Sequence, residues 1–151
     1  MQIKKATKFD LPEIIEMLKH FRENTPISIM AECDNHDYIS QLIHHILIGR
    51  GIVLLAEKDS RVIGMIMGYI DKTIWDPNIL VMNELAFWVE PEYRGTSAAY
   101  RLIKTYNDEV NKLKGEGRIK LFTMSKMINS PDLDYGRFGY KKIEEHWVGG
   151  I

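Results

Sequence analysis

The sequence is poor in cysteine, carries no excess charge of either sign and contains no long apolar run. Its single cysteine, Cys33, cannot form an internal disulfide and has no second thiol with which to bind zinc. The 20 basic and 21 acidic residues leave a net charge of −1, so the charge balance does not favour nucleic acid or an anionic membrane as a partner. No apolar run approaches the ~20 residues of a membrane-spanning helix. Residues 1–5 lack the apolar stretch of a secretory signal, and we therefore expect a soluble, cytoplasmic protein.

The composition that is present is that of a globular protein. Hydrophobic residues make up 45% and charged residues 27% of the 151 positions, which is the usual size and composition of one folded domain. The five histidines show no spacing typical of a metal site, so no bound metal is expected. We expect residues 1–151 to form a single domain.

Hydrophobic periodicity predicts strands and helices along the whole chain. Strands are expected at residues 2–6, 52–56, 62–70, 79–89, 120–124 and 140–148. Helices are expected from Asp10, where Glu13 completes a capping box, from about Asp37 to Gly49 and from about Ser97, with a short helical turn at 131–138. This order of elements predicts an α/β protein built on a mixed sheet.

The most informative segment joins the strand that ends at Val89 to the helix that begins near Ser97. The first turn of a helix presents unpaired backbone N–H groups and the positive end of the helix dipole. Arg94 adds a positive charge, Gly95 lets the backbone approach a ligand, and four small or hydroxylated residues follow: Thr96, Ser97, Ala98 and Ala99. These features predict a site for phosphate or pyrophosphate. The alternative is an ordinary strand-to-helix turn with a serine N-cap.

Two segments resemble the GNAT N-acetyltransferase superfamily. Residues 89–99 are similar to its acetyl-CoA pyrophosphate loop, whose signature is Gln/Arg-x-x-Gly-x-Gly/Ala; Arg94 and Ala99 match the ends, and Ser97 stands where the central glycine is usual. Residues 135–140 resemble the family's Tyr-x-Lys/Arg-x-Gly-Phe/Tyr, with Asn129 one place closer than expected. The resemblance implies the GNAT fold, in which helices flank a mixed, mostly antiparallel central sheet.

The resemblance also implies an activity: transfer of the acetyl group of acetyl-CoA to an amine by direct attack in a ternary complex, without an acyl-enzyme. It makes Tyr135 the candidate general acid, beside the sulfur of CoA. The alternative for Tyr135 is packing against the last strand. The implied acetyl-CoA contacts are the backbone groups of two strand residues, the pyrophosphate loop and the asparagine upstream of the second motif: Phe87, Val89, Arg94, Gly95, Thr96, Ser97, Ala98, Ala99 and Asn129.

Glu84 is a carboxylate inside the apolar strand 80–89. Strict alternation would place it on the same face as Met82, Ala86 and Trp88. A carboxylate in such a strand is costly unless it is hydrogen-bonded or faces a cleft. In the resembled family this position often holds a base that acts directly or through water, which makes Glu84 the candidate base. The alternative is a carboxylate that faces solvent or forms an ion pair.

Two other functions are compatible with the sequence. Ser97 and the displaced Asn129 also suit a GNAT-fold protein that binds CoA or a protein partner without catalysing transfer. A nucleotide-phosphate binder could use the same loop, and a comparison of acetyl-CoA with ATP as stabilising ligands would distinguish it. The acceptor could be an amine of a small molecule or a peptide. An edge strand near the C-terminus would allow a homodimer.

Overall fold

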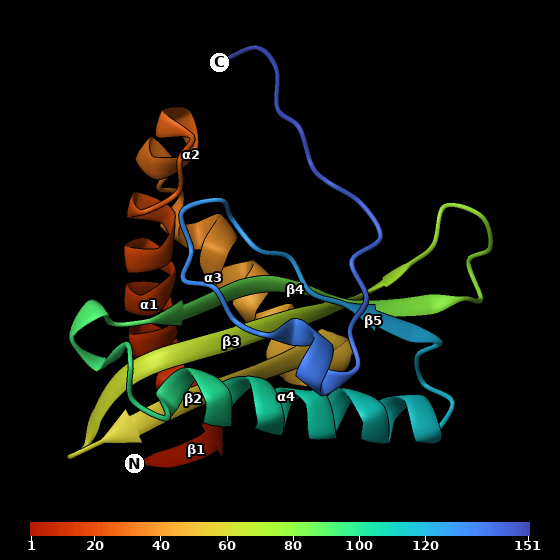
Figure 1. The fold of residues 1–151 in the computed structure, drawn as a ribbon, viewed down its shortest axis with the longest axis horizontal. Helices are drawn as coiled ribbons and strands as arrows, with labels where there is room; N and C mark the ends of the chain where they lie inside the picture. Colours follow the sequence, from red (N-terminus) through yellow and green to blue (C-terminus); the bar gives the residue numbers. More distant parts are fainter.

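The computed structural model describes residues 1–151, and its centre is a five-stranded sheet in the order β1-β2-β3-β4-β5 (Figure 1). The strands are β1 (Gln2–Lys5), β2 (Gly51–Lys58), β3 (Arg61–Lys72), β4 (Leu80–Val89) and β5 (Leu121–Thr123). Strands β1 to β4 pair antiparallel with their neighbours, whereas β5 runs parallel to β4. The arrangement confirms the predicted mixed, mostly antiparallel sheet.

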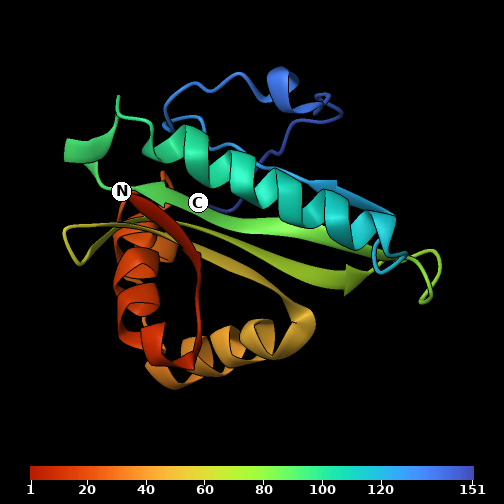
Figure 2. The same ribbon diagram turned by 90° about the horizontal axis from the view of Figure 1, so that it is seen from below.

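Helices cover both faces of this sheet. They are α1 (Leu11–Glu23), α2 (Ser28–Glu32), α3 (His36–His45) and α4 (Ala98–Gly115). Figure 2 shows α4 on one face, and α1 and α3 on the other. The core is divided accordingly: Tyr106 of α4 belongs to one buried cluster, and Ile14 of α1 and Ile43 of α3 belong to another. None of the helices is both long and apolar enough to cross a membrane.

The start of the first helix differs from the predicted one. Residues Lys8–Asp10 form a 3₁₀ turn ahead of α1, and the capping box closes between Thr7 and Asp10, one turn earlier than the predicted box of Asp10 and Glu13. The Asp10 carboxylate accepts from the Thr7 backbone N–H at 2.8 Å and from Lys4 Nζ at 3.1 Å. Because both carboxylate oxygens are engaged in this way, the side chain does not cap α1.

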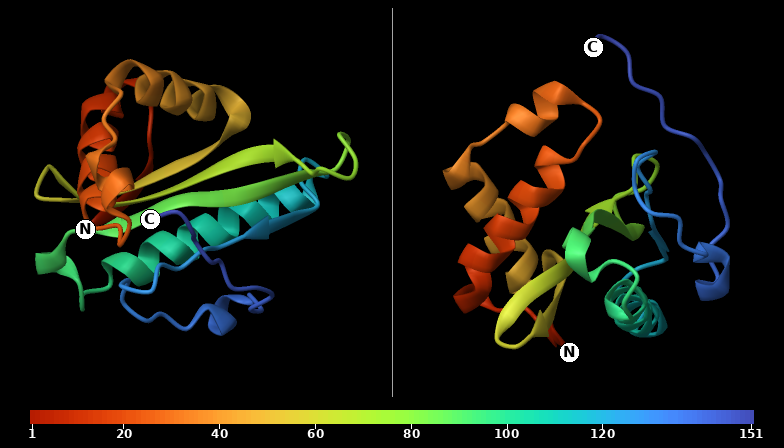
Figure 3. Two further views of the ribbon diagram at one scale, coloured as in Figure 1. Left: turned by 90° about the horizontal axis from the view of Figure 1, so that it is seen from above. Right: turned by 60° about the vertical axis from the view of Figure 1, so that its left-hand side comes forward.

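The predicted final strand, residues 140–148, is wrong. No residue after Thr123 belongs to a strand, and the C-terminal tail extends away from the sheet (Figure 3). Alternating apolar residues form a strand only beside a pairing partner and a face to cover. Strand β5 is three residues long, and Ile143 and Trp147 of the tail are exposed. The edge strand on which the expectation of a homodimer rested is therefore β5 alone.

Candidate active site

A bulge in β4 determines which side chains reach the site. Gly68 of β3 pairs with Glu84, and the preceding residue, Met67, pairs with Ala86, so Leu85 has no partner. One extra residue reverses the alternation of side chains along a strand. Met82 accordingly packs on the α4 face, whereas Ala86 and Trp88 pack on the α1 and α3 face. The expectation that Glu84 shares a face with Ala86 and Trp88 is therefore wrong.

Beyond the bulge, one edge of β4 has no neighbouring strand, because β5 pairs only with residues 81–83. The backbone N–H of Glu90 donates to the Ile63 carbonyl of β3 at 2.9 Å. In an antiparallel ladder successive residues point their backbone groups to opposite edges. The backbone groups of Val89 and Phe87 consequently point away from β3, toward the open edge. Both residues were expected to contact acetyl-CoA through these groups.

Glu84 is buried, with only 8% of its surface exposed, and it forms no ion pair. The carboxylate accepts one hydrogen bond, from the Ser125 backbone N–H at 3.2 Å. Burial disfavours the charged form and raises the pKa of Glu84 to about 7, against the opposing effect of the Ser125 N–H. The solvent-facing and ion-paired alternatives are both excluded, and the carboxyl titrates near neutral pH.

Three tyrosines lie near enough to this carboxyl for its charge to act on their hydroxyls: Tyr106 of α4, Tyr135 of the 3₁₀ turn Tyr135–Phe138, and Tyr140. Burial and then the negative charge of Glu84 raise the pKa of each hydroxyl above its ordinary value, for Tyr140 to about 12. The hydroxyls of Tyr106 and Tyr140 are buried and have no hydrogen-bond partner. The Glu84 carboxyl, which has only one hydrogen-bond donor, is thus near two hydroxyls that have no hydrogen-bond acceptor.

Tyr135 lies at the start of its turn, half-buried, with its ring 6.4 Å from that of Tyr140 at an interplanar angle of 83°. Packing against a final strand is excluded, because no such strand forms. Two members of the cluster, Tyr106 and Ser125, were not predicted. Tyr106 lies on the apolar stripe of its helix and resembles a core residue, and Ser125 contributes only its backbone. The second motif already contained Tyr140, but its hydroxyl was not singled out.

The predicted pyrophosphate loop lies between β4 and α4. Gly95 adopts φ 87°, which favours glycine, and a Cβ there would meet no atom within 4 Å. Thr96 Oγ1 donates to the Tyr93 carbonyl at 2.6 Å and accepts from the Ala98 N–H at 3.3 Å. Ser97, at the N-cap, makes no capping hydrogen bond. The serine cap of the alternative interpretation is therefore absent, and Thr96 provides the hydroxyl that stabilises the turn.

Arg94 and Asn129 are engaged elsewhere than expected. Arg94 Nε donates to the Val89 carbonyl at 2.9 Å, and the guanidinium lies 4.5 Å from the ring centre of Trp88. The arginine therefore braces the end of β4. Asn129 Nδ2 donates to the Asn24 carbonyl, at the end of α1, at 2.6 Å and makes no hydrogen bond to the loop.

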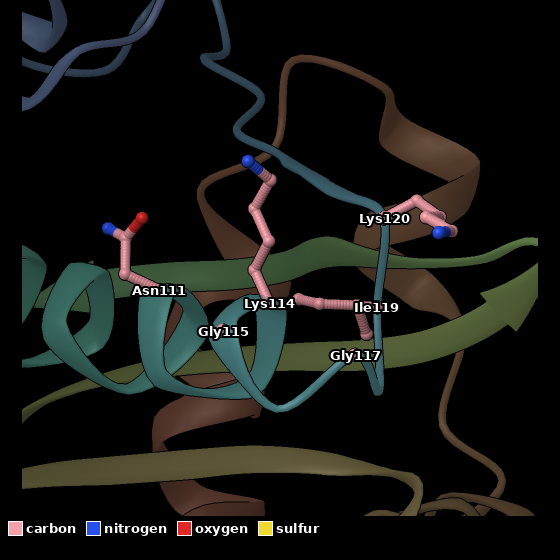
Figure 4. Close-up of a pocket in the computed structure, with 6 residues that line it drawn as sticks. All are labelled: Asn111, Lys114, Gly115, Gly117, Ile119 and Lys120. Carbon is pink, nitrogen blue, oxygen red and sulfur yellow. The ribbon is translucent and has the colours of Figure 1, made fainter.

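A second buried carboxylate, Glu90, directly follows β4 and pairs with His20 of α1, whose Nδ1 lies 2.5 Å from Glu90 Oε1. No cluster of three or more histidine, cysteine or acidic side chains is placed to hold a metal. A depression of about 380 Å³ lies at the C-terminal end of α4, where the side chains of Asn111, Lys114 and Lys120 point apart (Figure 4). Because its polar groups do not converge, it has no feature of a ligand site.

Comparison with protein families gives a match to the Acetyltransferase (GNAT) family over residues 14–140. No curated protein matches the chain. Among solved structures, a predicted acetyltransferase with acetyl-CoA from Clostridium acetobutylicum superposes with a TM-score of 0.74 at 16% identity, over 98% of this chain and 94% of that one.

Two further structures share the fold. A transcriptional regulator from Bacillus halodurans C-125 has a TM-score of 0.69 at 15% identity and covers 99% of both chains. An aminoglycoside acetyltransferase from an uncultured soil metagenomic sample, in complex with trehalose, has a TM-score of 0.68 at 12% identity and covers 99% of this chain and 95% of that one. At these identities the likeness concerns the fold.

Proposed function

The chain belongs to the acetyltransferase (GNAT) family, and on that premise we propose that it transfers the acetyl group of acetyl-CoA to an amine by direct attack in a ternary complex. The observation that carries the proposal is the buried Glu84 beside Tyr135, next to the open edge of β4. We assign residues 1–151 to one acetyltransferase domain, which the family match over 14–140 supports.

Glu84 is the base in this proposal. An amine attacks only after it loses the proton of its ammonium form, and a base works best with a pKa near the working pH. With a pKa of about 7, Glu84 is half-deprotonated at neutral pH and strong enough to accept that proton. No positive side chain pairs with the carboxylate, so it is free to change its protonation state.

Tyr135 is the proton donor. Because its pKa lies above the ordinary value near 10, its hydroxyl keeps its proton at neutral pH. A group that stays protonated until the reaction demands a proton suits the release of a thiolate.

The open edge and the loop would hold acetyl-CoA, which supplies the activated acetyl group. The backbone groups of Phe87 and the N–H of Val89 offer sheet-like hydrogen bonds along the edge, while the Val89 carbonyl accepts from Arg94. At the start of α4, Gly95 leaves space around the backbone, and Ser97 and Ala99 present backbone N–H groups to an anion, whereas the Ala98 N–H donates to Thr96 Oγ1. We assign Arg94 to bracing Val89, and Asn129 to holding the segment after β5.

The decisive experiment is a screen of primary amines, with free thiol as the readout and aminoglycosides included because a structure of similar fold acts on them. The wild type should release thiol with at least one amine. The Tyr135→Phe variant should bind acetyl-CoA as tightly and turn over roughly 10²–10⁴-fold more slowly, as expected for loss of one general acid.

The Gly95→Val variant tests whether the loop binds acetyl-CoA. It adds a side chain where φ is 87°, so acetyl-CoA affinity should fall sharply while the fold is kept. Unchanged affinity by calorimetry would reject the loop. Stabilisation by acetyl-CoA without thiol release from any amine would favour a binding protein instead. Greater stabilisation by ATP would favour a nucleotide site.

A further inference from the structure

We propose that Tyr106 is a positioning residue for Glu84: its hydroxyl, admitted to the sheet surface by Gly68, donates to the Glu84 carboxylate through one ordered water. The proposal rests on the proposed function, in which Glu84 is the base. It assigns a role to the hydroxyl of the fully buried Tyr106, which the motifs of the sequence do not include.

The geometry follows from the β3–β4 register. Gly68 lies directly opposite Glu84, and opposing residues of an antiparallel pair place their side chains on the same face, with Cβ atoms about 5 Å apart. Gly68 has no side chain, and a Cβ there would lie 2.3 Å from the Tyr106 hydroxyl oxygen. The hydroxyl therefore occupies the place of the cross-strand neighbour of Glu84. This placement depends on register and contact alone.

The two groups also have complementary needs. Tyr106 is fully buried, and its hydroxyl has no partner. Glu84 has a single donor, the Ser125 N–H, although a carboxylate accepts several hydrogen bonds. Buried polar groups in folded proteins are almost always paired, either directly or by ordered water. An ordered water between this donor and this acceptor satisfies both.

The groups that face Glu84 determine in which direction its pKa changes when the Tyr106 hydroxyl is removed. Tyr106 lies on the α4 side, and Tyr135 and Tyr140 come from the 3₁₀ turn and the residues after it, whereas β3 contributes no titratable side chain to this face, only Gly68 and apolar residues. None of them is cationic. A hydrogen bond to the charged form of a carboxyl favours that form. Removing the Tyr106 hydroxyl should therefore make Glu84 keep its proton to higher pH.

The test is an NMR titration of the ligand-free protein labelled with ¹³C at the glutamate carboxyls, with Glu84 assigned by the signal that Glu84→Gln removes. In Tyr106→Phe the Glu84 midpoint should rise by about one pH unit. The matched control is Tyr69→Phe, because Tyr69 adjoins Gly68 but packs on the opposite face of the sheet. It should leave the midpoint unchanged. An unchanged midpoint in Tyr106→Phe would overturn the proposal.

Two further measurements do not depend on that variant. In the wild type labelled at the tyrosine Cζ atoms, the Tyr106 signal should change with the same midpoint as Glu84, and a signal that ignores this midpoint would overturn the contact. Gly68→Ala should displace the hydroxyl and raise the Glu84 midpoint in the same direction. Combined with Tyr106→Phe it should add little, because the donor is already absent.

The rate measurement separates this proposal from the proposed function. If Glu84 is the base, the acidic limb of the pH profile for thiol release should move upward with the carboxyl midpoint in Tyr106→Phe. A midpoint that moves while the limb stays fixed would support the Tyr106 contact and reject Glu84 as the base. If neither the acidic limb of the rate profile nor the Glu84 midpoint moves in Tyr106→Phe, the Tyr106 contact is rejected.

Discussion

Glu84 and Glu90 lie on one stretch of chain and are the two buried acidic residues of the molecule, with 8% and 6% of their surfaces exposed. Glu90 meets His20 of α1 at 2.5 Å. Glu84 accepts one hydrogen bond, from a backbone N–H, and its charge acts on three nearby tyrosine hydroxyls, none of which carries a positive charge. The first carboxylate has a fixed partner, and the second has surroundings that resist its charge.

Burial alone thus does not make a carboxylate reactive; the partner it is buried with decides. A carboxylate held by a histidine joins two elements, here β4 and α1, and is suited to stability. A carboxylate with a pKa raised to about 7 exchanges its proton at neutral pH and is suited to chemistry. Replacing each glutamate with glutamine keeps the shape of the side chain and removes its charge, so the two Glu→Gln variants compare the roles of the two carboxylates.

The largest difference is expected in turnover. Glu84→Gln removes the proposed base, and thiol release with the amine found in the screen should fall roughly 10²–10⁴-fold, most strongly above about pH 7, where wild-type Glu84 is deprotonated while the amine is still an ammonium ion. Glu90→Gln lies outside the tyrosine cluster and should slow turnover less than about tenfold. The measurement is kcat/KM against pH for both variants. Equal losses would show that the two carboxylates are not functionally distinct.

In stability, Glu84→Gln should have the opposite effect, a gain. Below about pH 4.5 the carboxyl is protonated in the folded and unfolded chains and imposes no penalty. Between pH 4.5 and about 7 only the unfolded chain releases the proton, so the wild type loses stability as the pH rises. The change in pKa corresponds to about 3 kcal/mol, which Glu84→Gln should recover above pH 7. Urea unfolding at pH 4 and pH 8 measures it, and a loss at pH 8 would contradict the assignment.

Glu90→Gln should cost stability instead. The amide keeps the shape of the side chain but replaces a charge-assisted hydrogen bond to His20 with a neutral one, at a cost of about 1–2 kcal/mol in the free energy of unfolding. The same urea experiment measures it. A gain in stability would show that the buried Glu90, like Glu84, destabilises the fold, and the two carboxylates would no longer differ in this respect.

The smallest effect is expected at Arg94, which lies beside this pair at the end of β4. Arg94→Ala loses the hydrogen bond to Val89 and the contact with Trp88, and unfolding free energy should fall by about 1 kcal/mol. Because the guanidinium is engaged with β4, acetyl-CoA affinity should fall less than about tenfold. A larger loss in calorimetry, with stability unchanged, would show that the guanidinium leaves Trp88 to bind phosphate.

The contrast between the two carboxylates also marks what could be predicted from the sequence. Periodicity identified five of the six expected strands and the helix after the loop, because each repeats over several residues. It could not locate the bulge, since Leu85 looks like any other strand residue until β3 is aligned beside it. Because of that one residue, the prediction grouped Glu84 with Ala86 and Trp88 as well as with Met82, whereas only Met82 shares its face. The sixth strand failed because its alternation, unlike that of β4, has no partner to pair with.

The site was predicted where a motif named its residues and, for Glu84, where a carboxylate interrupts an apolar strand. Tyr135 and Gly95 stand in such motifs, and Tyr135 is near Glu84 in the structure. The role of Tyr106 depends on the register of Gly68 with Glu84, which joins three elements distant in the sequence. His20 lies 70 residues from Glu90, and no local pattern connects them.

The bracing of Trp88 by Arg94 has an optical consequence. The chain has three tryptophans, and Trp75 and Trp147 are almost fully exposed, whereas Trp88 is 7% exposed and lies under the guanidinium. Indole emission responds to polarity and to nearby charge, so the buried ring emits apart from a constant solvent-exposed background. A ligand that draws the 94–99 loop toward itself would change the charge over this one ring. The protein therefore carries an intrinsic fluorescent reporter of loop occupancy, and replacing Trp75 and Trp147 with phenylalanine would isolate its signal.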